Sequence, residues 1–338
     1  MSAESRDPHP AVALTATETA RPACSPSLGA PISEDVARVF VGCDPNNCDF
    51  EQMMVLEYSL RRHASIPVEI HWMQLSRDPA SPWYSQPEQD RGWRTDLWVT
   101  PFSGFRWAIP ALCGYQGRAI YMDADMVVLR DIADLWRTPF TYGQILAATK
   151  RKKKSWRYCV MVWDCAAAKD HLPPLDALRS TPEAHANLIH FFNDHPEFTY
   201  RLHPDENNVD GENRPLSDIR ILHYSDIGTQ FTHKYAFPRL AAEGSKHWFD
   251  GEVLPHPRAD LQALFDQYHA DALAAGYTLD QYRNAQPFGA IVKASQVNYT
   301  GNRRTRRMSL WSRIKWRLRG GRANAVAGTM AARQETVK

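Results

Sequence analysis

The sequence lacks the apolar run of about 20 residues that a membrane-spanning helix needs. Its mean hydropathy over 338 residues is −0.49, so we do not expect a transmembrane protein. No basic start followed by an apolar block occurs near residue 1, and we therefore expect no secretory signal. With 43% hydrophobic and 23% charged residues, the composition is that of a globular chain with an ample core, which excludes a collagen-like or mostly disordered protein.

Cysteine is also scarce, with six residues in the whole chain. The two close pairs, Cys43 with Cys48 and Cys159 with Cys165, do not have the C-x-x-C spacing of a zinc site. We expect a cytoplasmic location, where thiols stay reduced. The cysteines are then expected to pack as small buried hydrophobes, without forming disulfides or binding metal.

Charge is unevenly distributed, because residues 303–322 hold nine Lys or Arg and no acid. Trp311, Ile314 and Leu318 fall on one helical stripe between these charges. A basic amphipathic segment with tryptophan favours attachment to an anionic membrane surface. We predict that residues 301–338 form a tail that holds the protein at the inner membrane face and binds no nucleic acid. A solvated basic tail and a nucleic-acid-binding tail are the alternatives.

The chain divides into three parts. Residues 1–35 are rich in Ala, Ser, Thr and Pro without periodicity, which predicts a disordered leader. Residues 36–300 are predicted to form one α/β domain, because strands alternate with helices. The expected strands are 36–42, 67–75, 118–122, 144–149, 158–163 and 219–223, and the main expected helices are 50–64, 104–115 and 259–275. The Pro- and Trp-rich segment 76–103 is expected to be a loop facing substrate.

The most informative stretch is the strand 118–122 with the acidic pair Asp123 and Asp125 that follows it. In extended backbone, positions i and i+2 point to the same side, so both carboxylates can approach one divalent cation. Ligands of open α/β sheets bind outside the carboxyl ends of strands, where this pair lies. Mg²⁺ or Mn²⁺ held by carboxylates is usually completed by substrate phosphates and neutralises charge on a departing diphosphate. Two solvated acids capping a turn are the alternative.

The run YMDADMVVLRDIADLW resembles the metal-binding signature of glycosyltransferase family 8, the group of glycogenin and the lipopolysaccharide galactosyltransferases. Family members follow the D-x-D with a D-x-x-x-L-W element, which Asp131, Leu135 and Trp136 match. The run VARVFVGCDPN is similar to the family's opening strand and nucleotide-contacting turn. This resemblance spans residues 36 to about 250. It implies a GT-A fold with a largely parallel central sheet flanked by helices, a UDP-sugar donor, Mn²⁺ or Mg²⁺, and hexosyl transfer with retention at the anomeric carbon.

The resemblance also implies roles for individual residues. Asp123 and Asp125 would bind the metal, and the acceptor would be a glycan or a lipid-linked, lipopolysaccharide-type saccharide. The residues that would contact the donor or its phosphates are Val41, Gly42, Asp44, Arg106, Asp123, Ala124 and Asp125. For Arg106, a surface salt bridge is the alternative.

His223 ends the last expected strand and would reach the same edge of the sheet. Family members place a metal-binding histidine late in the chain, in an H-x-x-G-x-x-K-P-W-like segment. Here the glycine is displaced to Gly228 and no lysine follows at the family's spacing, although Lys234 could reach a phosphate. An imidazole beside two carboxylates would favour Mn²⁺ over Mg²⁺. A structural histidine is the alternative.

Two further polar residues are candidates for the catalytic centre. Asp164 closes the strand 158–163, and the resemblance implies a contact with the donor sugar. Glu206 lies in the polar loop 205–208, which by the same resemblance would meet sugar and acceptor. Hydrated turns are the alternative for both, and no residue stands out as a covalent nucleophile. The basic run 150–154 is a solvated loop or an electrostatic funnel for a phosphorylated ligand.

Three other functions remain open at this point. A HAD-type phosphatase also carries D-x-D after a hydrophobic strand, but normally on its first strand. A nucleotidyltransferase would normally show a Gly-rich basic loop after its first strand, and GCDPNNCDFE has one glycine and no basic residue. A sugar-nucleotide-binding protein with a degenerate site is the non-enzymatic alternative, and the intact acids of the motif argue against it.

Overall fold

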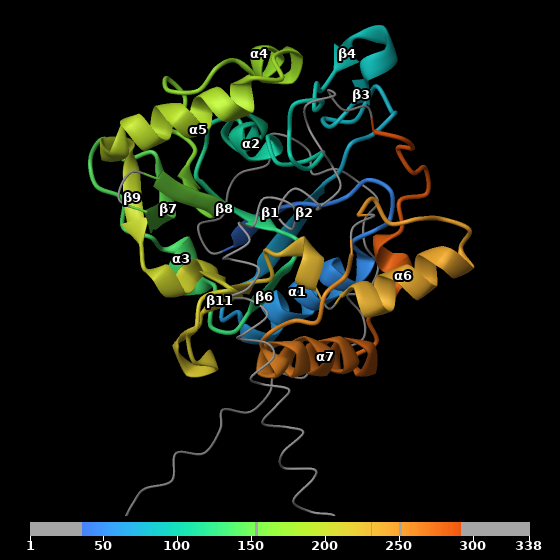
Figure 1. Ribbon diagram of the computed structural model, residues 1–338. Coiled ribbons are helices and arrows are strands. Elements are labelled where there is room, and N and C mark those ends of the chain that lie inside the picture. Colours follow the sequence, from blue (N-terminus) through green and yellow to red (C-terminus); the bar gives the residue numbers. More distant parts are fainter. Residues whose placement is uncertain (1–35, 153–154, 231, 250–251, 292–338) are drawn as a thin grey trace, which may run out of the picture.

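The computed structural model describes residues 36–152, 155–230, 232–249 and 252–291 (Figure 1). The predicted leader 1–35 and the predicted tail 301–338 lie outside these residues, as do residues 153 and 154 of the basic run. In the described part of the chain, no helix combines the length and the apolar character needed to cross a membrane.

A six-stranded sheet in the order β2-β1-β5-β8-β7-β9 forms the centre of the fold (Figure 1). Its strands are β1 (Ala37–Gly42), β2 (Val68–Met73), β5 (Arg118–Asp123), β7 (Leu146–Lys152), β8 (Ser155–Asp164) and β9 (Thr199–Leu202). The pairs β2–β1, β1–β5 and β7–β9 are parallel, and the two pairs that involve β8 are antiparallel. The predicted α/β fold with a largely parallel central sheet is confirmed.

A second, three-stranded sheet adjoins the end of β5. It has the order β10-β11-β6 and consists of β10 (Asn208–Val209), β11 (Ile221–His223) and β6 (Met126–Val128). The chain leaves the large sheet at Asp123 and enters the small sheet at Met126. The D-x-D motif therefore lies at the junction of the two sheets. The remaining strands, β3 (Ser85–Gln86) and β4 (Arg91–Gly92), form a short hairpin.

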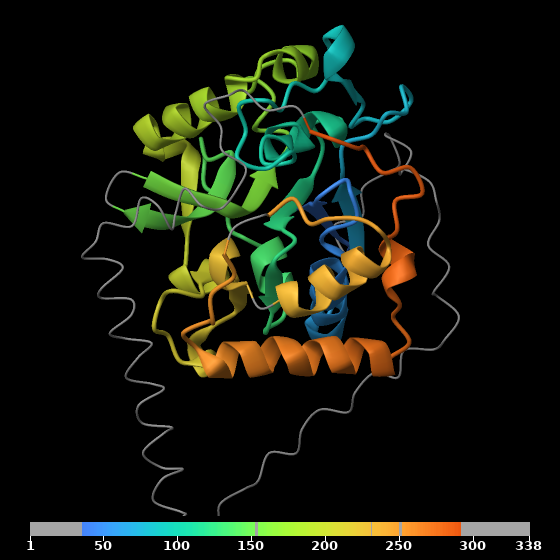
Figure 2. The same ribbon diagram turned by 45° about the vertical axis from the view of Figure 1, so that its right-hand side comes forward.

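Helices cover both faces of the large sheet (Figures 1 and 2). They are α1 (Phe50–His63), α2 (Ile109–Leu112), α3 (Ala133–Trp136), α4 (Leu175–Ser180), α5 (Ala184–Asp194), α6 (His233–Ala242) and α7 (Ala259–Ala274). On β5, Tyr121 belongs to a core cluster with Phe192 of α5, whereas Met122 belongs to a second cluster with Leu56 of α1. This alternation is what a strand between two helical layers requires.

The segment 76–103, which was predicted to be a loop, contains the hairpin β3–β4 and several buried tryptophans, and its substrate-facing role stays a prediction. Its residues Trp83, Trp93 and Trp98 are buried and pack on Phe105, with ring centroids 4.4, 5.0 and 5.5 Å away. Because each tryptophan can bury about 150–250 Å² of surface, these rings act as core residues that anchor the segment. The predicted helix 104–115 is also shorter, since only the 3₁₀ turn η2 (Phe105–Trp107) and α2 form there.

Candidate active site

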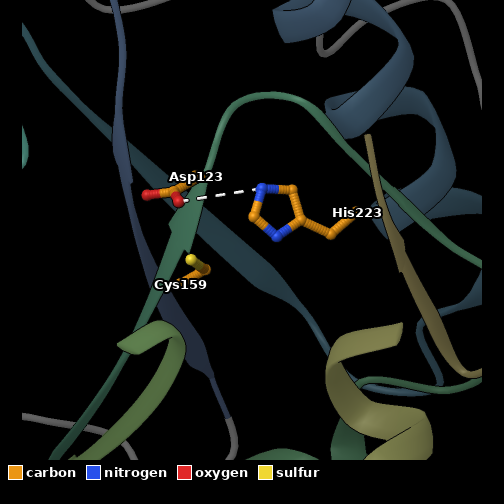
Figure 3. A group of neighbouring side chains, drawn as sticks. All are labelled: Asp123, Cys159 and His223. Atoms are coloured by element: carbon orange, nitrogen blue, oxygen red, sulfur yellow. Dashed lines mark ion pairs between the residues drawn. The ribbon is translucent and has the colours of Figure 1, made fainter. Parts of the chain in front are cut away.

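The pairing of β6 with β11 brings the predicted metal ligands together. In the antiparallel pair β6–β11, His223 lies opposite Met126, and the backbone N–H of Tyr224 donates to the carbonyl of Asp125 at 2.9 Å. The His223 Nε2 atom then lies 3.1 Å from Asp125 Oδ1 and 3.9 Å from Asp123 Oδ2. Figure 3 shows the imidazole facing the Asp123 carboxylate across the end of β5.

Asp123 is oriented by two neighbours that occupy one of its oxygens. The hydroxyl of Tyr121 donates to Asp123 Oδ1, and Arg106 Nη2 donates to the same atom at 3.3 Å. The other oxygen, Oδ2, is the one that faces His223. Metal-binding carboxylates are commonly held by hydrogen bonds in this way. Tyr121 was not among the predicted residues, although its position two before Asp123 places it on the same side of the strand.

Arg106 lies on η2 and is buried against the site. Its Nε donates to the carbonyl of Ser103 at 2.7 Å, its Nη1 donates to the carbonyl of Tyr158, and the guanidinium stacks on the Tyr121 ring at 4.4 Å. Burial lowers the pKa of Arg106, but Tyr121 and Asp123 more than offset this and raise it. The structure thus places a permanent positive charge beside Asp123, where the sequence predicted a donor contact.

Asp125 is held from the opposite side by an amide relay. Gln230 Nε2 donates to Asp125 Oδ2 at 2.8 Å and to the carbonyl of Tyr224 at 2.5 Å. The oxygen of the same amide accepts from Gln52 Nε2 of α1 at 3.0 Å. The relay fixes which Asp125 oxygen faces His223. Sequence reasoning missed Gln230, because it lies in an irregular segment and no spacing pattern marks it.

The donor set fits a divalent cation such as Mn²⁺. Asp125 Oδ1 and His223 Nδ1 are buried and have no hydrogen-bond partner, and Asp125 Oδ1 faces the ring without an aligned hydrogen bond. Burial lowers the pKa of His223, yet the charge of Asp125 outweighs burial and raises it well above its ordinary value. The site therefore attracts positive charge, and two carboxylates with one imidazole are ligands that Mn²⁺ accepts.

The end of β1 borders this cluster. Gly42 pairs with Asp123 across the parallel β1–β5 ladder, directly after Val41. A Cβ at Gly42 would lie 2.7 Å from Phe102 Cδ2 and 3.1 Å from the Tyr121 hydroxyl, so only glycine fits this backbone without displacing a neighbour. The predicted nucleotide-contacting strand end is thus closely packed against the site.

Asp44 organises the turn that follows. Its Oδ1 accepts from the N–H of Asn46 at 2.7 Å, and its own N–H donates to Asp49 Oδ2 at 2.8 Å. Burial raises the pKa of Asp44, and burial together with the Asp44 charge raises that of Asp49 well above its ordinary value. Asp44 Oδ2 is buried without a hydrogen-bond partner.

Comparison with known proteins identifies part of the chain. Residues 94–172, which include Arg106 and the D-x-D motif, match the family described as "Glycosyl transferase family 8". The resemblance to that family is confirmed. The family 8 segment begins before η2 and extends past the end of β8.

Similarity to individual proteins is lower and partial. The chain is 37% identical to "Protein CDI" of Arabidopsis thaliana over 100 residues, which are 29% of this chain and 35% of that protein. The bifunctional glycosyltransferase WbbM superposes with a TM-score of 0.48 and 13% identity, covering 75% of this chain and 52% of that one. The galactosyltransferase LgtC, solved with donor and acceptor sugar analogues, superposes with a TM-score of 0.44 and 10% identity, covering 69% of this chain and 95% of LgtC. GlyE of Streptococcus pneumoniae superposes with a TM-score of 0.44 and 19% identity, covering 73% of this chain and 63% of GlyE. The chain thus spans about a third of the curated relative and about half of WbbM.

Asp164, within the family 8 segment, does not lie at this edge of the sheet. It pairs with Arg118 at the start of β5, and its Oδ1 accepts from the N–H of Ala167 at 3.0 Å. The reason is that β8 runs antiparallel to β5, so its carboxyl end lies at the opposite edge from Asp123. The structure thus places Asp164 away from Asp123, and the contact with the donor sugar that the resemblance implied stays a prediction.

Glu206 and Lys234 also lie apart from the cluster. Glu206, on the 3₁₀ turn η4 (Pro204–Asn207), forms an ion pair with Arg220, whose Nε lies 2.9 Å from Glu206 Oε1. Arg220 precedes β11 at the end opposite His223. Burial raises the pKa of Glu206 to about 7, although Arg220 opposes this. Lys234 Nζ, on α6, lies 2.5 Å from Asp266 Oδ2 of α7. Both side chains are thus paired with residues outside the cluster, and the roles predicted for them, catalysis for Glu206 and phosphate binding for Lys234, stay predictions.

Cys159 is the site residue that sequence reasoning assigned to the core. One ligand atom from each of Asp123, Cys159 and His223 lies within 4.8 Å of the other two, and Figure 3 shows the three side chains together. The family 8 resemblance gave no signal for this thiol, because it depends on an irregularity in β8 that is described below.

Proposed function

We propose that the protein is a retaining glycosyltransferase that moves a hexosyl group from a UDP-sugar to a glycan or lipid-linked saccharide. The observation that carries the proposal is the convergence of Asp123, Asp125 and His223 at one sheet edge, with the D-x-D inside the family 8 segment. The donor, the stereochemistry and the acceptor come from the resemblance.

The residues of the chain would divide the work as follows. Asp123, Asp125 and His223 would hold Mn²⁺ or Mg²⁺, which when bound neutralises charge on the departing diphosphate. Arg106 orients the carboxylate of Asp123 through a hydrogen bond, and Gln230 does the same for Asp125. Val41, Gly42, Asp44 and Ala124 border the same edge and would contact the nucleotide through backbone and turn. Arg106 and Gln230 each contact one carboxylate oxygen, so that the other oxygen of Asp123 and of Asp125 remains available to bind a cation.

The cellular setting is part of the proposal. The basic and apolar residues of 303–322 support peripheral binding to an anionic membrane from the cytoplasmic side. Such a position would bring the site to a lipid-linked acceptor. It rests on the sequence pattern alone.

The test is a thermal-shift screen of UDP-sugars with and without Mn²⁺. A donor at about 100-fold excess over its Kd stabilises the folded protein by about 2.7 kcal/mol, and we expect this only when metal is present. Asp125→Asn should abolish the metal-dependent shift, whereas the control Asp134→Asn, at an exposed carboxylate paired with Arg220, should retain it. Hydrolysis of simple phosphate esters without any response to UDP-sugars would instead favour the phosphatase.

A further inference from the structure

The thiol of Cys159 adds a soft ligand to a site that otherwise offers oxygen and nitrogen. Its sulfur, a carboxylate oxygen of Asp123 and a ring nitrogen of His223 lie within 4.8 Å of one another (Figure 3). Donor atoms around a tetrahedral Zn²⁺ lie about 3.3–3.8 Å apart, given the usual metal–ligand bond lengths. Contraction of about 1 Å, within reach of side-chain rotation, would close the three donors around one ion.

A bulge in β8 is what presents this sulfur. Ala148 of β7 pairs with Met161, but the next pair is Thr149 with Arg157, so the β8 residues between them have no partners on β7. On the other side, Val160 pairs with Met122, which places Cys159 beside Asp123. Bulges re-aim side chains and are frequent next to active sites.

The bulge is held in place by the site itself. Arg106 donates to the carbonyl of Tyr158, the residue before Cys159, and also to Asp123. The same guanidinium therefore fixes both the carboxylate and the backbone that carries the thiol. The three donors come from three different strands, and Arg106 anchors two of them, Asp123 and the backbone beside Cys159.

The chemistry of the donor set decides the class of ion. Mn²⁺ and Mg²⁺ prefer carboxylate oxygens, whereas thiolate with imidazole selects Zn²⁺ or Co²⁺. Three protein ligands with an open fourth position are the arrangement of catalytic zinc sites. Beside Asp123 and His223, Asp125 offers a hard oxygen ligand and Cys159 offers a soft sulfur ligand.

We propose that Asp123, Cys159 and His223 form a site for a thiophilic divalent cation, Zn²⁺ or Co²⁺, which overlaps the Mn²⁺ site and competes for it. The competing Mn²⁺ site rests on the proposed function. Metal binding by the Cys159 thiolate, in contrast, can be measured without any enzymatic reaction. When a thiophilic ion binds there, it takes Asp123 and His223 as ligands, and these two residues are then no longer available to Mn²⁺.

The experiment is a titration of the full-length metal-free protein with Co²⁺, followed by the thiolate-to-cobalt charge-transfer absorption. We expect the band in the wild type and in Cys113→Ser, and its loss in Cys159→Ser. Cys113 is the matched control, because it is also partly exposed and interacts with Cys165 in a different part of the fold. Competition by Zn²⁺ should show binding at least about 100-fold weaker in Cys159→Ser, since even the loss of an outer-shell partner costs 10–100-fold.

A second measurement on the wild type does not depend on how the variant folds. Alkylation of each cysteine, followed by peptide mass spectrometry, should be slowed by Zn²⁺ at Cys159 and not at Cys113. A charge-transfer band that persists in Cys159→Ser, or alkylation of Cys159 at an unchanged rate with Zn²⁺, overturns the proposal. Metal-dependent binding of a UDP-sugar without thiolate ligation would support the glycosyltransferase and refute this site. Thiolate ligation of Co²⁺ without any binding of a UDP-sugar would support this site and refute the proposed function.

Discussion

Removal of the Arg106 side chain should destabilise the protein more than any comparable change at an exposed arginine. The guanidinium donates to two backbone carbonyls, to the Tyr121 hydroxyl and to Asp123, and it is buried. Each buried acceptor left without a donor costs about 1–3 kcal/mol, and breaking a buried ion pair typically costs about 3–5 kcal/mol. We expect Arg106→Ala to lower the free energy of unfolding by about 3–5 kcal/mol.

Urea denaturation followed by tryptophan fluorescence measures this loss. The control is Arg283→Ala, which removes an exposed arginine paired with Glu243 at 3.0 Å and should cost less than about 1 kcal/mol. In Arg106→Ala the carboxylate of Asp123 loses its partner charge, and the additional substitution Asp123→Ala removes that unpaired carboxylate. The loss of unfolding free energy in the double variant should therefore be about 1–3 kcal/mol smaller than the sum of the losses in the two single variants. Equal losses in the two single arginine variants, or strict additivity in the double variant, would refute the assignment of Arg106 as the anchor of Asp123.

Three further predictions follow from the packing, the titration and the sequence pattern. Gly42→Ala should cost about 1–3 kcal/mol in urea denaturation, because its Cβ would lie 2.7 Å from Phe102; unchanged stability would show that the strand end yields freely. The folded-state pKa of Glu206, about 7, exceeds its ordinary 4.5, so ionisation disfavours the folded state. The stability of the wild type relative to Glu206→Gln should therefore fall by up to about 3 kcal/mol as pH rises from about 4.5 through 7, and a pH-independent difference would count against this burial. Deletion of residues 303–338 should release the protein from anionic vesicles in a sedimentation assay; unchanged partition would reject the tail as an anchor.

Sequence reasoning located the site where local rules suffice. A strand that ends in two acids predicts a cation at the carboxyl edge of the sheet, and the structure places Asp123 and Asp125 there. Strand direction is not a local property, however. The antiparallel course of β8 sends Asp164 to the far edge and brings its bulged middle, with Cys159, to the near one. The same limit applies to Gln230, whose role depends on where an irregular segment folds back.

The spacing of the D-x-D motif has a more specific cause than the side-chain alternation of one strand. Asp123 is the last residue of its strand in the large sheet, and Asp125 lies in the bend just before the small sheet, so the two carboxylates do not belong to one extended strand. His223 reaches both because β11 pairs with β6 and its neighbour Tyr224 donates to the carbonyl of Asp125. Ala124 is the single residue between the acids and is 3% exposed. One small buried residue is therefore what the junction accommodates, and a longer or bulkier connection would separate the carboxylates that the cation has to join.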